Sequence, residues 1–214
     1  RFGYATDQQH LPGLLHGAIL RSRHAHARLL RVDPSRARLM SGVRAVVTAA
    51  DVPGLNRLGI VVRDQPVLCE DRVRYEGDAI AAVAADTVEQ ARAALEVIDV
   101  DYAPLAVVDQ AETAEQMAPL HGESNLLARE AFERGDTDAA FARCAVIVEH
   151  HYQTPRQMHA FMETEGGVAI PDNNGGVIFR VGCQSGHRDA EQLADILGLK
   201  LSQVTVEATP TGGA

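Results

Sequence analysis

The protein has 214 residues, of which 46% are hydrophobic and 23% are charged. These proportions are typical of a globular protein, and the length allows one large domain or two small ones. The formal net charge of −9 argues against a nucleic-acid-binding face, which would need a basic patch to neutralise phosphates. The charge fits a protein whose partners are small molecules or other proteins.

The three cysteines, Cys69, Cys144 and Cys183, lie far apart in the sequence and form no CxxC motif. An odd number of separated thiols indicates a reducing compartment, so we expect a cytoplasmic protein. No apolar run reaches the roughly 18 residues that a membrane-spanning helix needs. The opening residues are polar and unlike a signal peptide, and we therefore expect the interior of a longer chain.

The first part of the chain is predicted to contain strands and one short helix. Apolar and β-branched runs predict strands over 14–20, 27–32 and 43–48. Pro34 opens a short helix over 35–40, which Gly42 closes.

A βαβ unit is predicted over residues 79–102. The almost continuous apolar run over 79–84 is typical of a strand that is buried on both faces. Thr87 and Gln90 form the pattern of a capping box, in which each side chain satisfies the backbone N–H of the other. A helix over 88–98 and a strand over 98–102 would follow.

The second half of the chain begins with a connecting segment and ends in strands around a helix. We expect short helices over 109–116 and 136–144, and a strand over 146–152. A hairpin over 168–170 and 177–181, with PDNNGG as its turn, is followed by a helix over 187–197 and a strand over 204–208. The predicted class is α+β.

Histidines gather at two places that could bind a metal. His24 and His26 lie two residues apart beside a strand, where polar turn residues are the better interpretation. The densest titratable cluster consists of Glu149, His150, His151, His159, Glu163 and Glu165. It lacks the supporting context of a metal motif, so we favour residues that orient backbone and line a cleft. Cys183 has no base near it in sequence and is interpreted as a structural thiol.

Five stretches, in this order and spacing, resemble one family: the molybdenum-binding subunit of the xanthine dehydrogenase and aldehyde oxidase type. LPGLLHGAILRSRHAHARLLRVDPSRA is similar to the entry segment of that family, and residues 42–54 and 68–105 continue it. GDTDAAFARCAVIVEHHYQTPRQMHAFMETEGGVAI resembles the crossing into its first molybdopterin-binding domain. VGCQSGHRDAEQLADILGLKLSQVTVEATPTGGA resembles the next segment, so the likeness covers essentially the whole chain.

The resemblance implies a fold and a division of the chain. An α/β hammerhead domain over 1–105 would be followed by a connecting segment over 106–140. Residues 141–214 would form the N-terminal part of a mixed α/β molybdopterin-binding domain. The chain would be a segment of a much longer subunit.

The resemblance also implies an activity: hydroxylation of a purine, an aldehyde or an N-heterocycle with water as the oxygen donor. The cofactor would be molybdenum–molybdopterin, with the pterin in its plain form or as the cytosine dinucleotide. Electrons would leave through 2Fe-2S and FAD centres in partner subunits or domains, and the full assembly would be a homodimer.

Three positions match functional residues of that family. Gln184 matches the glutamine that hydrogen-bonds an oxygen ligand of molybdenum, for which an amide can donate without adding charge. Gly212 and Gly213 match the start of a glycine loop that passes the metal, where backbone N–H groups can reach such a ligand. No metal ligand is expected in this chain. The general-base glutamate and the substrate-holding residues of the family lie beyond Ala214, so we expect residues 1–214 alone to be inactive.

Two other function classes stay open at the level of sequence. The hammerhead segment could serve as a non-catalytic assembly module that binds the flavin and iron–sulfur partners. An unrelated metal-binding protein that uses His150, His151 and His159 is the third class.

Overall fold

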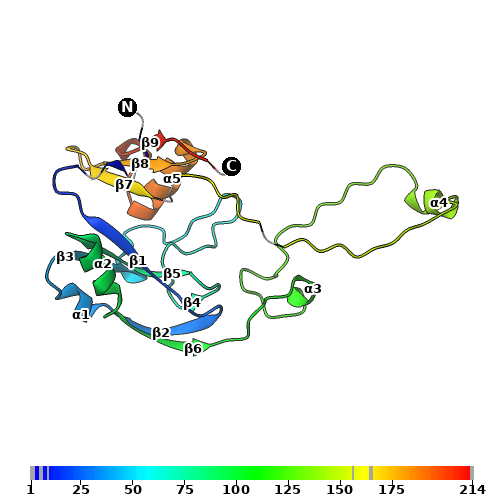
Figure 1. Cartoon of the computed structure of the whole chain (residues 1–214), viewed down its shortest axis with the longest axis horizontal. Coiled ribbons are helices and arrows are strands. Elements are labelled where there is room, and N and C mark those ends of the chain that lie inside the picture. The colour runs from blue at the N-terminus through cyan, green and yellow to red at the C-terminus, as the bar shows by residue number, and fades with distance from the viewer. Residues whose placement is uncertain (1–2, 5–6, 9, 156, 164–165, 213–214) are drawn as a thin grey trace.

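The computed structural model describes residues 3–4, 7–8, 10–155, 157–163 and 166–212. These residues form three sheets of three strands each. Two of the sheets make up a first body, residues 10–105, and the third belongs to a second body, residues 166–212 (Figure 1). Between the two bodies in the sequence, residues 127–155 form an arm that extends away from both.

The first sheet has β5 (Ala79–Ala85) at its centre, between β1 (His16–Arg21) and β3 (Val43–Thr48). Both neighbours run antiparallel to β5. The alanine-rich sequence of β5 is covered on both faces, as predicted, and Ile80, Ala81 and Ala85 are fully buried. Two short helices, α1 (Ser35–Arg38) and α2 (Val88–Leu95), pack against this sheet, and a 3-10 turn, η2 (Ala49–Asp51), follows β3.

The second sheet contradicts the predicted βαβ unit. Its order is β4 (Arg72–Val73), β2 (Ala27–Asp33), β6 (Asp99–Pro104), so the strands on either side of α2 lie in different sheets. The reason is that β1 and β3 already occupy both edges of β5. The strand β6 therefore pairs antiparallel with β2 instead.

The predicted capping box at the start of α2 is half correct. The Thr87 hydroxyl accepts a hydrogen bond of 3.2 Å from the Gln90 N–H. The Gln90 side chain does not reach back: its carbonyl oxygen is buried without a partner among the described residues. The amide lies against Gly42, where a Cβ would overlap it. The left-handed φ of 81° at Gly42 also favours glycine.

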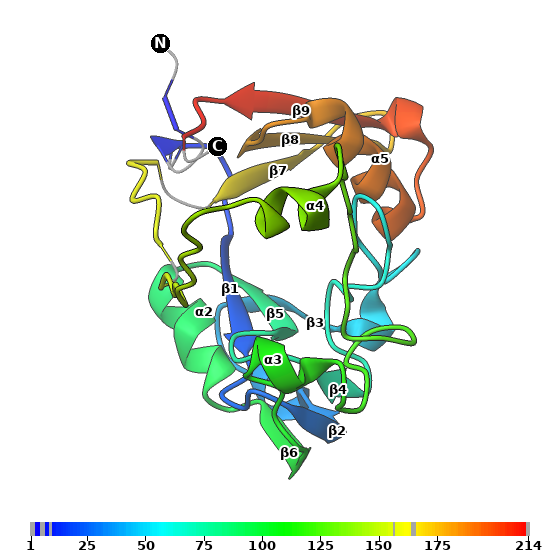
Figure 2. The same cartoon turned by 90° about the vertical axis from the view of Figure 1, so that its right-hand side faces the viewer.

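The arm carries the other wrong prediction. Residues 146–152 form no strand: they run as irregular chain, with Val146 77% and Val148 72% exposed. A strand needs a partner, and none of the described residues pairs with this segment. The arm bends back at α4 (Thr137–Ala142), which Asp136 caps as predicted by accepting from the Ala139 N–H at 2.8 Å (Figure 2). The other connecting helix, α3 (Ala111–Ala114), lies near the first body.

The second body combines a hairpin with a parallel crossover. The predicted hairpin is confirmed: β7 (Gly167–Pro171) and β8 (Val177–Gly182) run antiparallel. Its turn is held by the Asp172 carboxylate, which accepts from the N–H groups of Asn174 and Gly176. Helix α5 (Gly186–Leu197), a 3-10 turn, η3 (Leu201–Gln203), and β9 (Val204–Thr209) complete it. The mixed α and β class is confirmed, whereas the division at residues 105 and 140 stays a prediction.

Candidate functional site

The edge of the third sheet where β8 and β9 end is the candidate site. These two strands run parallel and are joined by α5, with Gly182 paired to Thr209 at the last position of the register. Parallel strands bring their carboxyl ends to one edge, which is where ligands bind in many open sheets. The residues that follow Gly182 and those that follow Thr209 therefore lie at the same edge.

Two of the three predicted site residues are described, and both lie at this edge. Gln184 comes two residues after the end of β8, is exposed, and makes no side-chain hydrogen bond with any described residue. Gly212 comes three residues after the end of β9. Gly213 lies outside the described residues. The structure thus brings Gln184 and the glycine turn, 28 positions apart, to one place.

Thr211 connects the two turns. Its hydroxyl oxygen lies 3.3 Å from the carbonyl oxygen of Cys183 and 3.1 Å from that of Thr209, to which it can donate. The turn after β8 is therefore tied to the turn after β9 by a side chain, in addition to the strand pairing. The sequence held one signal for this contact: a threonine beside proline at the end of a strand often bonds local backbone.

Glu163, which precedes β7, is the second residue that sequence reasoning did not connect with the site. Its carboxylate accepts a hydrogen bond from the Gly212 N–H. A Cβ at residue 212 would overlap this carboxylate. The Gly212 N–H thus has a partner within the chain, which fixes the course of the glycine turn.

Cys183 is a protonated thiol at neutral pH. Burial raises the pKa of its thiol, and the neighbouring Asp189 carboxylate raises it further. A nucleophilic cysteine needs the opposite shift. This supports the interpretation of Cys183 as a structural residue.

The histidine clusters do not form sites. No group of three histidine, cysteine or acidic residues with metal-binding geometry occurs within the described ranges. His24 stacks on Tyr102, and His26 Nδ1 lies 2.5 Å from the carbonyl of Ala106. His150, His151 and His159 are exposed, and no other element of the described chain encloses them, so the expected cleft stays a prediction. Glu163 of the same cluster does contact backbone, at the Gly212 N–H. Glu165 lies outside the described residues.

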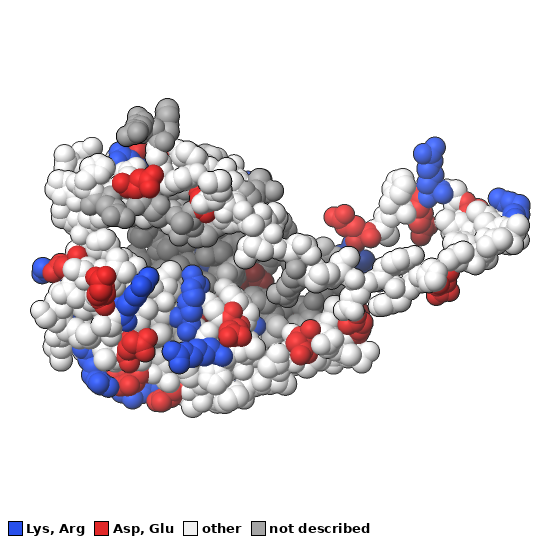
Figure 3. Space-filling model, in the orientation of Figure 1, with Lys and Arg blue, Asp and Glu red and all other residues white. Residues whose placement is uncertain are grey.

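Charges are dispersed over the surface. Figure 3 shows acidic and basic side chains intermixed over the first body, with no continuous basic face in this view. Many of the arginines are paired, such as Arg44 with Asp86 at 2.7 Å. Within the described part of the chain, no helix has the length and apolarity to cross a membrane.

Two family models match the chain. Residues 1–106 match the a/b hammerhead domain of aldehyde oxidase and xanthine dehydrogenase, and residues 120–214 match the molybdopterin cofactor-binding domain. The chain belongs to the xanthine dehydrogenase and aldehyde oxidase family. The family predicted from the sequence is therefore confirmed, together with the hammerhead fold of its first part.

Similar proteins support this assignment over the whole chain. A probable xanthine dehydrogenase subunit from Bacillus subtilis is 49% identical over 99% of this chain and 28% of its own length. The nicotinate dehydrogenase large molybdopterin subunit of Eubacterium barkeri is 39% identical over 98% of this chain and 50% of its own. The crystal structure of the aldehyde oxidoreductase from Desulfovibrio desulfuricans superposes with a TM-score of 0.87 at 28% identity, and covers 100% of this chain and 25% of that one.

The chain thus spans between a quarter and a half of the length of these relatives. It corresponds to the molybdenum-binding region of a family of oxidoreductases. The chemistry of the edge fits a molybdopterin group: an exposed, uncharged amide donor stands beside the turn that contains Gly212. The adjoining helix α5 has Ser185 at its N-cap position, and this side chain makes no capping hydrogen bond among the described residues, which leaves N–H groups available to an anionic ligand.

Proposed function

We propose that this chain supplies the hammerhead domain and the start of the first cofactor-binding domain of a molybdenum-dependent hydroxylase, and that Gln184 is its contact with the metal centre. One observation carries the proposal: the parallel β8–α5–β9 crossover sets an exposed Gln184 beside the turn of Thr211 and Gly212. A glutamine in this position can donate its amide N–H to an oxygen ligand of molybdenum.

When bound, the molybdenum–pterin group supplies the redox chemistry, in which a carbon centre is hydroxylated with oxygen from water. The task of this chain is to hold a neutral donor in place. Gln184 donates without bringing a charge, and Gly212 with Gly213 allow backbone to pass close to the group. The pterin would be bound in its plain form or as the cytosine dinucleotide.

The general base comes from residues outside this chain. Two described carboxylates contact the turns at this edge, and both are engaged. Glu163 accepts from the Gly212 N–H, and Asp189 lies beside the Cys183 thiol. Neither has the freedom to take a proton from a substrate or water, so residues 1–214 alone are expected to be inactive and to hold no stoichiometric molybdenum.

The substrate is a purine, an aldehyde or an N-heterocycle. The names of the relatives, which include xanthine, nicotinate and aldehyde enzymes, span these three classes. The electrons would pass to 2Fe-2S and FAD centres in partner subunits or domains. The relatives named as subunits support such an assembly, which we propose to be a cytoplasmic homodimer.

Substitution of Gln184 in the complete enzyme tests this proposal. Loss of one donor at a centre of changing charge typically lowers kcat by about a hundredfold. We expect Gln184→Ala to lose activity on this scale and to retain its molybdenum content. Gln116→Ala is the matched control, because Gln116 is exposed in the connecting segment, two residues after α3, which lies near the first body. Unchanged kcat in Gln184→Ala at full molybdenum content would overturn the proposal.

A second role, in assembly, is favoured by the arm. Almost every described residue from 127 to 155 is exposed, although the arm is rich in large apolar side chains. Those with more than half of their surface exposed are Leu127, Phe132, Phe141, Val146, Ile147, Val148 and Tyr152. Apolar surface of this extent is normally covered. We propose that further polypeptide of the complete enzyme covers it. Association of the chain with the flavin and iron–sulfur partners in a pull-down would test the assembly role.

A further inference from the structure

A loop of the first body closes the C-terminal end of helix α5 in the second body. The Gly54 N–H donates to the carbonyl of Ile196 at 2.9 Å, and the Leu55 N–H donates to that of Asp195 at 2.8 Å. The last carbonyls of a helix have no partner within the helix. Here two of them are satisfied by backbone from more than 130 residues earlier in the sequence.

Side chains add two more contacts between the same loop and the helix. The Gly59 N–H donates to the side-chain oxygen of Gln192 at 2.9 Å. Arg63 forms an ion pair with the Asp195 carboxylate. That pair is partly exposed and contributes little by itself, but it fixes the far end of the loop. We call residues 53–63 the brace.

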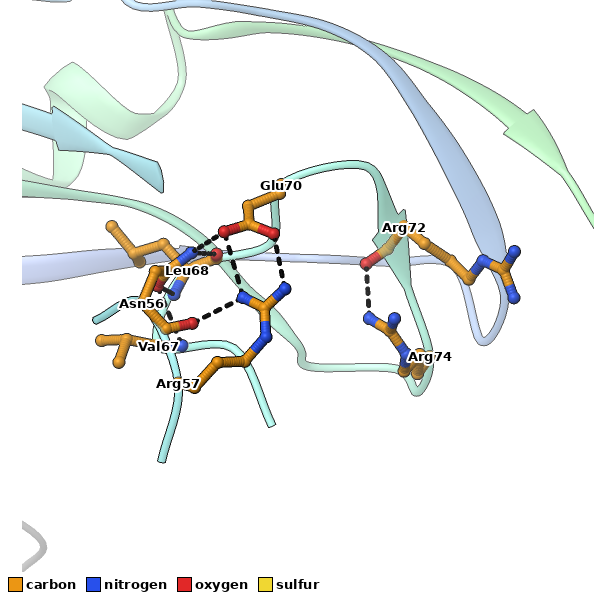
Figure 4. A network of polar contacts seen from close by, with 7 residues as sticks. All are labelled: Asn56, Arg57, Val67, Leu68, Glu70, Arg72 and Arg74. Atoms are coloured by element: carbon orange, nitrogen blue, oxygen red, sulfur yellow. Dashed lines mark hydrogen bonds and ion pairs between the residues drawn. The ribbon is translucent and has the colours of Figure 1, made fainter. Parts of the chain in front are cut away.

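The brace is rigid at its base. Asn56, 8% exposed, donates its amide to the carbonyl of Leu68 at 2.8 Å and to the Glu70 carboxylate at 3.0 Å (Figure 4). Its oxygen accepts from the N–H groups of Val67 and Leu68, both at 3.1 Å. All donors and acceptors of this buried amide are therefore satisfied. Arg57 adds a two-point contact with Glu70.

The approach of the brace to α5 depends on glycine at residue 54. A Cβ there would overlap the backbone carbonyl of Asp195 and lie 2.7 Å from the backbone nitrogen of Gly198. These are backbone atoms, which cannot swing aside as a side chain can. The φ of Gly54 is not in the left-handed region, so space rather than backbone conformation requires the glycine.

The fully buried contacts between α5 and its sheet come from Ala190 and Ala194 of the helix and Val204 of β9, and partly buried side chains such as Leu193 and Phe179 pack around them. This apolar packing has no preferred direction along the helix axis. The hydrogen bonds of the brace to the carbonyls of residues 195 and 196 are directional and oppose a shift of the helix along this axis.

We propose that the brace is a positioning element for Gln184. Helix α5 has 12 residues and begins two residues after Gln184, so a rigid helix carries a displacement of its C-terminal end to the Gln184 turn. Through the brace the hammerhead domain sets the place from which Gln184 meets the cofactor. This inference rests on the proposed role of Gln184.

The test compares Gly54→Ala with Gly17→Ala. Gly17 is a matched control, because a Cβ there meets no described atom within 4 Å and its φ is not left-handed. Gln192→Ala is a milder second variant that removes only the acceptor of the Gly59 N–H. Amide resonances and hydrogen exchange are followed in the chain of residues 1–214, and the molybdenum(V) paramagnetic resonance spectrum is followed in the complete enzyme.

Loss of a hydrogen bond of ordinary strength should speed amide exchange at residues 197–199 about fivefold to tenfold in Gly54→Ala. We expect the Gln184 amide resonance to move in the same variant, and in Gln192→Ala in the same direction by less, while Gly17→Ala leaves both unchanged. The molybdenum(V) spectrum of the complete enzyme should change in Gly54→Ala at unaltered metal content.

An unmoved Gln184 resonance in the presence of faster exchange at residues 197–199 would overturn the inference, because the brace would then act only locally. If Gly54→Ala fails to fold, Gln192→Ala replaces it, and an unmoved Gln184 resonance in that variant would likewise overturn the inference. A moved resonance with an unchanged molybdenum(V) spectrum in both Gly54→Ala and Gln184→Ala would refute the proposed role of Gln184 and leave the mechanical coupling standing.

Discussion

The hydroxyl of Thr211 lies 3.3 Å from the carbonyl oxygen of Cys183, and this contact joins the turn after β8 to the turn after β9. The two strands are already paired up to Gly182 and Thr209. Beyond that pair the ladder ends, so the relative position of Gln184 and Gly212 depends on contacts between the turns themselves.

Thr211→Val, which keeps the shape of the side chain and removes the hydroxyl, should loosen these turns. One ordinary hydrogen bond is worth about 1 kcal/mol, so global stability should fall by no more than that. Amide exchange at Gln184 and Gly212 should rise severalfold. Thr205→Val is the control, since Thr205 is an exposed threonine of β9 whose side chain makes no hydrogen bond among the described residues. Equal exchange in the two variants would show that strand pairing alone fixes the turns.

Two substitutions of Glu163 separate the effect of its charge from the effect of its acceptor oxygen. The Gly212 N–H donates to this side chain, so Glu163→Ala leaves the N–H without its partner, while Glu163→Gln retains an acceptor oxygen. We expect the Gly212 amide to exchange about fivefold to tenfold faster in the alanine variant and close to the wild-type rate in the glutamine variant. Fast exchange in both variants would show that the charge, and not the acceptor, is required.

Glu70 should give the base of the brace a pH-dependent stability. Hydrogen bonds from Arg57 and Asn56 lower the pKa of this carboxyl below the ordinary glutamate value. A carboxyl whose pKa is lowered by folding contributes stability that is present above its unfolded pKa and is lost as the pH falls through its folded pKa. The midpoint of urea unfolding should therefore fall on acidification across this window.

Glu70→Gln is the variant for this prediction. It should be less stable than the wild type at pH 7, and the difference should shrink as the pH falls from the ordinary glutamate pKa through the lowered pKa of folded Glu70, below which both proteins carry a neutral side chain. Glu123→Gln, a change of an exposed glutamate in the connecting segment, serves as the control. A difference that stays constant down to the folded pKa would contradict the assignment of the effect to the charge of Glu70.

The sequence predicted the elements better than their pairing. Helix α5 and the hairpin of β7 and β8 were predictable because their signals are local: helical spacing closed by Gly198, and a turn built on Asp172. Which sheet β6 joins was not predictable, because this depends on the strand edges that β1 and β3 leave free. Periodicity along one segment carries no information on that choice.

The same limit of local sequence signals explains which residues of the site could be predicted. Gln184 and Gly212 were predicted as site residues from the likeness of their surroundings to a family, and their role stays a prediction. Glu163 and the brace were not, because their partners lie 49 and more than 130 residues away in the sequence. The segment over 146–152 shows the opposite error. Its β-branched residues have the propensity for a strand. Whether such a segment forms a strand depends on its neighbours, and the described chain offers no strand with which it pairs.

The arm should be the first part of the isolated chain to be cut by trypsin. Its described basic residues, Arg129, Arg134 and Arg143, are exposed and lie in or beside irregular chain. Cleavage there needs little local unfolding, whereas Arg44 lies within a strand and is paired with Asp86. Mass spectrometry of a short digest should therefore show cuts within residues 129–143 before any cut in the first body.

The complete enzyme provides the contrast that tests whether other polypeptide covers the arm. Burial of its apolar side chains should slow cleavage at these arginines by at least about tenfold, because the protease must then wait for local opening. A variant with Val146 and Val148 changed to serine should restore cleavage in the complete enzyme and leave the rate in the isolated chain unchanged. Equal rates in the isolated chain and the complete enzyme would mean that the arm stays free, and that its exposed apolar residues have another role.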